Sequence, residues 1–184
     1  MTRLAVLSGR YPESVPSSEP LLVVMGVSGS GKTTVGELLA TRLGVPFADA
    51  DDLHSRANIA LMAAGHPLTD EDRWPWLAKV GAALSAAEST GLVMACSALK
   101  RSYRDAILSA EPRARFVSLD GSRDLLVARL SNRHGHFMPP ELLDSQLAAL
   151  EPLATDEPGI TVRLEASQDP ATLVELAAEE LGLQ

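Results

Sequence analysis

The sequence has few of the features that mark secreted or membrane proteins. Its single cysteine, Cys96, excludes an internal disulfide framework, and its place in an apolar run predicts a buried packing residue. No apolar run approaches the roughly 18 residues that a membrane span needs. Residues 1–20 lack the long apolar stretch of a signal peptide. We therefore expect a cytoplasmic protein with no membrane partner.

Basic and aromatic residues are also scarce. The chain has 16 Lys and Arg against 24 Asp and Glu, a net charge of −8. General nucleic-acid binding needs a basic face, so no nucleic-acid partner is expected. Aromatic residues make up only 4% of the chain, and Trp74 and Trp76 are predicted to pack at a helix start rather than to stack on bases.

The order of apolar segments predicts the fold class. Residues 1–20, rich in proline and serine from Tyr11 onward, are expected to be a flexible arm. Residues 21–184 are expected to form one domain. Within it, short apolar runs alternate with longer segments of helical spacing, at 21–25, 45–48, 92–96, 115–119 and 160–164. This alternation predicts an α/β fold, a parallel sheet with helices on both faces.

The strongest functional signal is the segment Gly26 to Thr33, GVSGSGKT, which matches G-x-x-x-x-G-K-[ST] at every fixed position. It follows a predicted strand and opens a predicted helix, the context of a phosphate-binding P-loop. Lys32 is expected to reach the β- and γ-phosphates of ATP, and the Thr33 hydroxyl to ligate Mg²⁺. The expected nucleotide-binding residues are Gly26, Ser28, Gly29, Ser30, Gly31, Lys32, Thr33 and Thr34.

Missing motifs narrow the class of P-loop protein. The chain has no N-K-x-D motif, which a switch GTPase uses to read guanine, and no L-S-G-G-Q motif of an ABC ATPase. Its small size favours a phosphotransferase that binds a second, compact substrate.

Polar residues after the second predicted strand point to the acceptor. If that strand continues, Asp49 and Asp51 lie on the same side of it. We expect Asp51 to accept the proton of the attacking hydroxyl or to hold Mg²⁺ through water, with Asp49 as the competing candidate. The acceptor region, about residues 51–77, mixes cations with neutral polar groups, which suits a polyhydroxylated anion. Its expected ligands are His54, Arg56 and Asn58, and Arg73, farther along the chain, could reach the same acceptor.

Two further pairs of basic residues are candidates for anion binding. Lys100 and Arg104 are four residues apart, so on a helix they would share a face and could hold an acceptor carboxylate or a phosphate. Arg129 and Arg133 are spaced likewise, just before Gly135. We expect residues of about 129–142 to form a mobile lid whose arginines neutralise charge on the transferred group.

The motifs taken together resemble the gluconokinase family. The resemblance covers residues 21 to about 165 and rests on these segments: 49–58, GHPLTDEDR at 65–73, PWL at 75–77, CSALK with YR at 96–104, RHGHFM at 133–138, and SQ with LEP at 145–152. This sequence departs from many members of that family at Ser55, where they have proline.

This resemblance implies ATP-dependent phosphorylation of D-gluconate to 6-phosphogluconate. It also implies a nucleoside-monophosphate-kinase-like fold with strand order 2-3-1-4-5, commonly a homodimer, and it adds His136 of the lid segment to the acceptor ligands. Another small-metabolite kinase is the nearest alternative; shikimate kinase, however, uses a glycine triplet after its third strand, and this chain has no two adjacent glycines. A nucleotide-dependent regulatory module is the alternative from another class.

Overall fold

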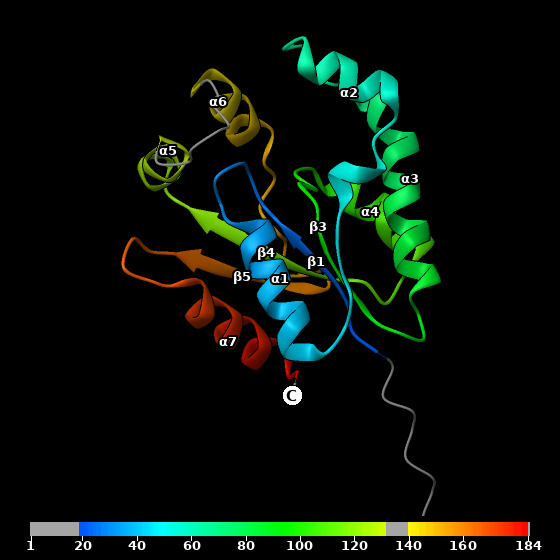
Figure 1. Ribbon diagram of the computed structural model, residues 1–184, viewed down its shortest axis with the longest axis vertical. Helices are drawn as coiled ribbons and strands as arrows, with labels where there is room; N and C mark the ends of the chain where they lie inside the picture. Colours follow the sequence, from blue (N-terminus) through cyan, green and yellow to red (C-terminus); the bar gives the residue numbers. More distant parts are fainter. Residues whose placement is uncertain (1–18, 132–139, 184) are drawn as a thin grey trace, which may run out of the picture.

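The computed structural model describes residues 19–131 and 140–183, in which five strands form one parallel sheet of order β2-β3-β1-β4-β5 (Figure 1). The strands are β1 (Leu21–Met25), β2 (Phe47–Asp49), β3 (Leu92–Ala95), β4 (Arg115–Gly121) and β5 (Gly159–Leu164). The helices are α1 (Lys32–Leu43), α2 (Arg56–Ala63), α3 (Asp70–Ala86), α4 (Arg101–Ala110), α5 (Arg123–Ser131), α6 (Pro140–Ala149) and α7 (Pro170–Leu181), with a 3₁₀ helix η1 (Ala50–Leu53) after β2. The α/β fold class and the strand order are confirmed.

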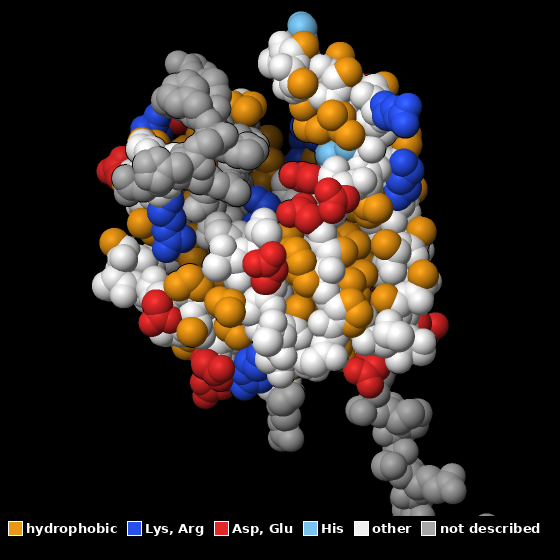
Figure 2. Space-filling view, viewed as in Figure 1, with side chains coloured by type: hydrophobic (Ala, Val, Ile, Leu, Met, Phe, Trp, Pro, Cys, Tyr) orange, Lys and Arg blue, Asp and Glu red, His pale blue; other side chains and the backbone are white. Residues whose placement is uncertain are grey.

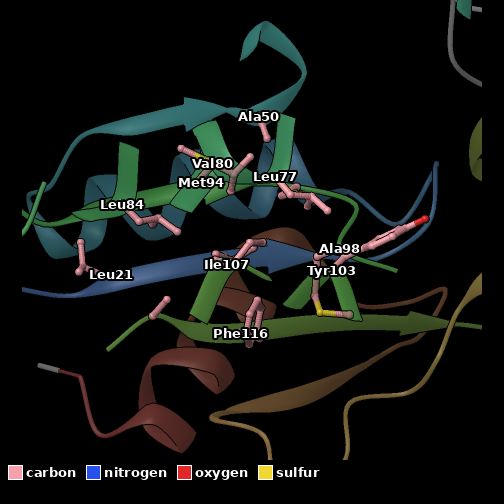
Figure 3. Packing of buried hydrophobic residues seen from close by; sticks show 14 of the residues in the cluster. Leu21, Ala50, Leu77, Val80, Leu84, Met94, Ala98, Tyr103, Ile107 and Phe116 are labelled. Carbon is pink, nitrogen blue, oxygen red and sulfur yellow. The ribbon is translucent and has the colours of Figure 1, made fainter. Parts of the chain in front are cut away.

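The sheet lies between two helical layers, with α1 and α7 on one face and α3 and α4 on the other (Figure 1). Side chains of the central strand β1 alternate between the layers: Val23 packs with Leu77 of α3 and Ile107 of α4, and Val24 packs with Leu39 of α1. Figure 3 shows the cluster on the α3–α4 side. Burial on both faces explains why the strands are continuous apolar runs rather than alternating ones.

Strand β2 begins two residues later than the predicted run 45–48 and ends one residue beyond it, at Asp49. The predicted run starts at residue 45, but the Val45 N–H donates to the Ala40 carbonyl and so completes the end of α1. Pro46 has no N–H to give. The strand therefore spans only Phe47–Asp49. It does not continue to Asp51, because the Asp49 side chain accepts the Asp51 N–H and turns the chain into η1.

Helix α3 runs through Pro75 rather than starting after it. Its first turn is held by a capping box, in which Thr69 and Asp72 bond reciprocally to backbone N–H groups. Beyond Pro75, the buried side chains of Leu77 and Leu84 anchor one face of the helix on the sheet. This packing outweighs the hydrogen bond that the proline cannot donate.

The topology brings three chain segments to one edge of the sheet. The P-loop follows β1, Asp49 ends β2, and Lys100 follows β3, and these three strands are neighbours. Ligands of open α/β sheets bind at such carboxyl ends.

Most of the predicted arm (1–18) and of the predicted lid (132–139) lies outside the described residues. In the described part of the chain, no helix is both long and apolar enough to span a membrane.

Candidate active site

The P-loop has a backbone that only glycine tolerates at its start. Gly26 has a φ of +142°, and a Cβ there would lie 2.8 Å from the Leu119 carbonyl oxygen. Gly31, also at positive φ, is the N-cap of α1 and offers no side-chain acceptor to the first turn. The N–H groups at this helix start therefore remain available to an anion, and the helix dipole favours one there. The Lys32 ammonium donates to the Val27 carbonyl at 3.1 Å, so it lies over the loop.

The carboxylate that contacts the P-loop is Asp49. The Thr33 hydroxyl donates to Asp49 Oδ2 at 3.3 Å, while Asp49 Oδ1 accepts the Asp51 N–H at 3.0 Å. A hydroxyl and a carboxylate are hard oxygen ligands, the kind that Mg²⁺ prefers. Asp49, rather than Asp51, is thus the acid beside the predicted metal ligand Thr33.

Asp51 lies at the mouth of the site in a different setting. Its side chain is 80% exposed, with Oδ1 3.9 Å from His54 Nε2. Partial loss of hydration and the like charge of Asp49 raise the pKa of Asp51, whereas Lys32 lowers it. A carboxylate that faces open solvent, near the P-loop lysine and with a raised pKa, has the properties of a proton acceptor for a small hydroxyl.

His54 is held rigidly against the core. Its ring stacks on Trp76 with centroids 4.4 Å apart, and the Trp76 Nε1–H donates to the Ala50 carbonyl at 2.6 Å. Burial lowers the pKa of His54 more than the charge of Asp51 raises it, which favours the neutral form of the ring. Trp76 is a packing residue, as predicted, and it fixes His54 beside Asp51.

The predicted acceptor residues Lys100 and Arg73 meet in a cluster with two residues that were not assigned to the site. The Lys100 ammonium contacts both oxygens of Asp70 at 2.8 Å, and the Tyr103 hydroxyl donates to Asp70 Oδ1 at 2.5 Å. Arg73 lies 5.7 Å from the Tyr103 ring centroid. Hydrogen bonds from Lys100 and Tyr103 lower the pKa of Asp70. We call Asp70, Arg73, Lys100 and Tyr103 the acceptor cluster.

Arg104 is not part of this cluster. Lys100 is the N-cap of α4 rather than a residue within it, so the two basic side chains do not share a helix face. The Arg104 side chain is 0% exposed and pairs with Glu157, itself 2% exposed. Its remaining N–H groups donate to the carbonyls of Ala98, Leu99, Glu151 and Pro152. All five donors are used, so the acceptor role expected for Arg104 is corrected to a structural one.

We predict that Arg104→Ala reduces the free energy of unfolding by about 3–5 kcal/mol, because it leaves Glu157 buried without its partner. Urea unfolding measures this loss. Arg101→Ala is the matched control, since Arg101 lies on the same helix and pairs with Asp156 at 2.7 Å, but in an exposed setting where the loss is much smaller. A stable Arg104→Ala protein with a weakened acceptor KM would contradict the structural role.

The other predicted acceptor ligands divide between the surface and the core. Asn58 is 7% exposed, and its amide donates to the Asp72 carbonyl at 2.9 Å, so it joins α2 to α3 rather than facing the site. Arg56 is exposed at the start of α2. Arg133 and His136 lie outside the described residues.

Helices α5 and α6 lie on the side of the sheet edge away from α2 (Figure 1), and acidic side chains gather on the surface near the base of α2 (Figure 2). Arg129 of α5 donates to the Ser30 carbonyl at 3.3 Å, which places this predicted lid arginine on the P-loop. Gln146 of α6 accepts the Ser28 N–H at 2.7 Å.

The residues that sequence reasoning did not assign have partners distant in the chain. Asp70 meets Lys100 across 30 residues, and Gln146 meets Ser28 across 118. The segments that carry them were noted as motifs, TDEDR and SQ, but a motif does not tell what its side chains contact.

Comparisons with known proteins agree with this geometry. A family model described as shikimate kinase matches residues 28–151. A gluconokinase of Gluconobacter oxydans is 51% identical over 150 residues, which cover 80% of this chain and 84% of that protein. The thermosensitive gluconokinase of Escherichia coli is 45% identical over 83% of this chain and 82% of its own. The crystal structure of a gluconokinase from Sinorhizobium meliloti has a TM-score of 0.81 at 46% identity, covering 89% of this chain and 91% of that one.

Proposed function

The chain belongs to the gluconokinase family of shikimate kinase-like P-loop kinases, and from this membership we propose that it transfers the γ-phosphate of ATP to the 6-hydroxyl of D-gluconate. The observation that carries the proposal is the meeting of three groups at one sheet edge: the P-loop after β1, the carboxylates of Asp49 and Asp51 at the end of β2, and the acceptor cluster that includes Lys100 after β3. This arrangement offers one site for a polyphosphate and one for a polyhydroxylated acid.

The phosphate side of the site fits MgATP. The N–H groups of Gly29 and Gly31 to Thr33 and the Lys32 ammonium would hold the phosphates, and Thr33 and Asp49 would hold Mg²⁺ directly or through water. No group of three or more acidic, His or Cys side chains suited to a metal occurs in the described ranges. That fits an ion which takes one or two protein ligands and completes its shell with water and phosphate oxygens. When bound, Mg²⁺ supplies positive charge to the β- and γ-phosphates.

The acceptor side of the site supplies the base and the charge. Asp51 accepts the proton of the gluconate 6-hydroxyl. The oxygen of that hydroxyl bonds to the γ-phosphorus as the bond between the γ-phosphorus and the β,γ-bridging oxygen breaks, and ADP leaves. Neutral His54 beside Asp51 offers a hydrogen bond to an acceptor hydroxyl. Lys100 and Arg73 present positive charge to the gluconate carboxylate, and Asp70 fixes the position of Lys100. Arg129, already on the P-loop, offsets charge on the transferred group.

We predict that gluconate is phosphorylated and that glucose, which lacks the carboxylate, has a kcat/KM at least about 100-fold lower. The reason is that glucose brings no carboxylate to which the positive charges of Lys100 and Arg73 can contribute binding energy. A coupled ADP-release assay over gluconate, glucose and shikimate measures the ratio.

Shikimate belongs in this panel because the matching family model is that of shikimate kinase. A kcat/KM for shikimate above that for gluconate would mean that shikimate, and not gluconate, is the acceptor. Equal kcat/KM values for glucose and gluconate would show that the carboxylate does not contribute to acceptor recognition. Nucleotide binding without ADP release for any acceptor would favour a regulatory module.

We also propose that the protein acts as a homodimer in the cytoplasm. The family resemblance supports the dimer, and so does helix α2, which exposes apolar side chains at Ile59 (50%) and Met62 (43%) that a second copy would cover. Sedimentation velocity measures the oligomeric state.

A further inference from the structure

Gln146 is a polar contact of the P-loop to which the proposed mechanism gives no role. It lies on α6, and its side-chain carbonyl Oε1 accepts the Ser28 N–H at 2.7 Å. Ser28 is the third residue of the phosphate-binding segment. A side chain from 118 residues away therefore holds a backbone group of the loop on which the γ-phosphate would rest.

Helix α6 is anchored on the same loop by apolar packing. Leu143, which is 0% exposed and three residues before Gln146, packs in a cluster with Val27 of the P-loop and Leu126 of α5. Arg123 of α5 joins Asp144 of α6 through two hydrogen bonds, at 2.7 and 3.0 Å. Residues three apart share a helix face, so the packing of Leu143 carries Gln146 to the loop in a defined position.

The hydrogen bond from Ser28 also orients the amide group of Gln146. Because a backbone N–H can only donate, the atom facing it is the carbonyl oxygen, and the NH₂ group lies on the other branch of the same planar amide. Within residues 19–131 and 140–183, this NH₂ group donates to no protein acceptor. Two N–H donors are thus held beside an anion site, and no described residue accepts from them.

We propose that Gln146 is a ligand of the γ-phosphate: its carbonyl fixes the Ser28 N–H, and its NH₂ group donates to an oxygen of the terminal phosphate. The inference rests on the proposed function for the identity of the nucleotide, ATP, but not on the acceptor. It makes α6 the element that distinguishes ATP from ADP, because only ATP presents a γ-phosphate to this donor.

The test compares two variants by their affinities for two nucleotides. Gln146→Glu keeps an acceptor for the Ser28 N–H but cannot donate a hydrogen bond, and it adds a negative charge. Gln146→Ala removes both the acceptor and the donor. The probes are the Mg²⁺ complexes of ADP and of the non-hydrolysable β,γ-imido analogue of ATP, measured by titration calorimetry. Ser145→Ala is the matched control, since Ser145 is the exposed neighbour on α6 and its hydroxyl donates to the Leu142 carbonyl of the same helix.

We expect Gln146→Glu to weaken the ATP analogue about 10- to 100-fold, the range for one hydrogen bond to a charged group, and to change ADP affinity less than about threefold. Gln146→Ala should weaken the analogue about tenfold with the same selectivity, and Ser145→Ala should change neither. Because these affinities are measured without acceptor, they remain decisive even if gluconate proves not to be the substrate.

Three results would overturn the proposal. Equal losses for both nucleotides would mean that Gln146 only maintains the shape of the loop. Tighter binding of the analogue to Gln146→Ala would mean that the glutamine occupies a phosphate position which ATP must take from it. Unchanged affinities for both nucleotides in both variants would show that Gln146 does not contribute to nucleotide binding. If Gln146→Glu lowers the melting temperature, its affinities also reflect a disturbed fold, and the affinities of Gln146→Ala alone decide whether the proposal holds.

Discussion

Replacing Lys32 by alanine should lower turnover by at least about 10³-fold while the protein remains folded, because charge clamps on transferring phosphoryl groups contribute rate factors of that size. The fold should tolerate the change, since Lys32 is partly exposed and its ammonium donates to the Val27 carbonyl of the same loop. Steady-state ADP release measures the activity, and circular dichroism with thermal unfolding checks the fold.

The matched control for this variant is Arg42→Ala, which removes a basic side chain from the other end of the same helix. Arg42 pairs with Glu175 on α7 at 3.0 Å, far along α1 from the P-loop. Its activity should stay within about threefold of the wild type. A folded Lys32→Ala protein with near-native turnover would show that GVSGSGKT is not the catalytic phosphate site.

The P-loop and the positions of the strands along the chain could be predicted because both depend on local patterns, whereas the order of the strands in the sheet was implied only by the family resemblance. The glycines of residues 26–31 determine their own backbone, and a fully buried parallel strand reads as an apolar run wherever it occurs. The helix ends were predictable for the same reason: Asp169 caps α7, Gly44 ends α1 at a positive φ, and Thr69 with Asp72 starts α3. Each of these devices acts within a few residues.

The contacts that decide what a charged side chain does could not be predicted in the same way. Arg104 looks like an exposed partner of Lys100 in sequence, but Glu157, 53 residues away, meets it in the core. Lys100 in turn is bound by Asp70 across 30 residues. Spacing within a helix predicts neighbours on that helix only, and these partners come from other elements that the sheet brings together.

The two carboxylates after β2 show how one hydrogen bond can separate two similar residues. The two-residue period of a strand would place Asp49 and Asp51 side by side, but the strand ends where Asp49 accepts the Asp51 N–H. The turn leaves Asp49 bonded to Thr33 and directs Asp51 to the open mouth of the site. From this geometry we infer that Asp49 serves the metal and Asp51 the acceptor hydroxyl.

Asp51→Asn should therefore lower kcat by roughly 10²- to 10⁴-fold, the span for removal of a positioned general base, while MgATP affinity changes little. Asparagine keeps the size and much of the hydrogen bonding but cannot accept the proton. A loose transition state, in which the proton leaves late, would place the effect at the low end of that span. Turnover and nucleotide titrations on the same preparations separate the two effects.

Asp49→Asn is the paired variant, and it should act differently in two respects. MgATP affinity should fall, because the carboxylate beside Thr33 loses its charge. Partial loss of hydration and then the charge of Asp49 raise the pKa of Asp51, so neutralising Asp49 should lower that pKa and move the acid limb of the activity profile to lower pH. If Asp49→Asn abolishes turnover at unchanged MgATP affinity while Asp51→Asn is fully active, the roles are reversed. If both variants lose MgATP affinity in proportion to turnover, both carboxylates belong to the metal site and the acceptor hydroxyl has another base.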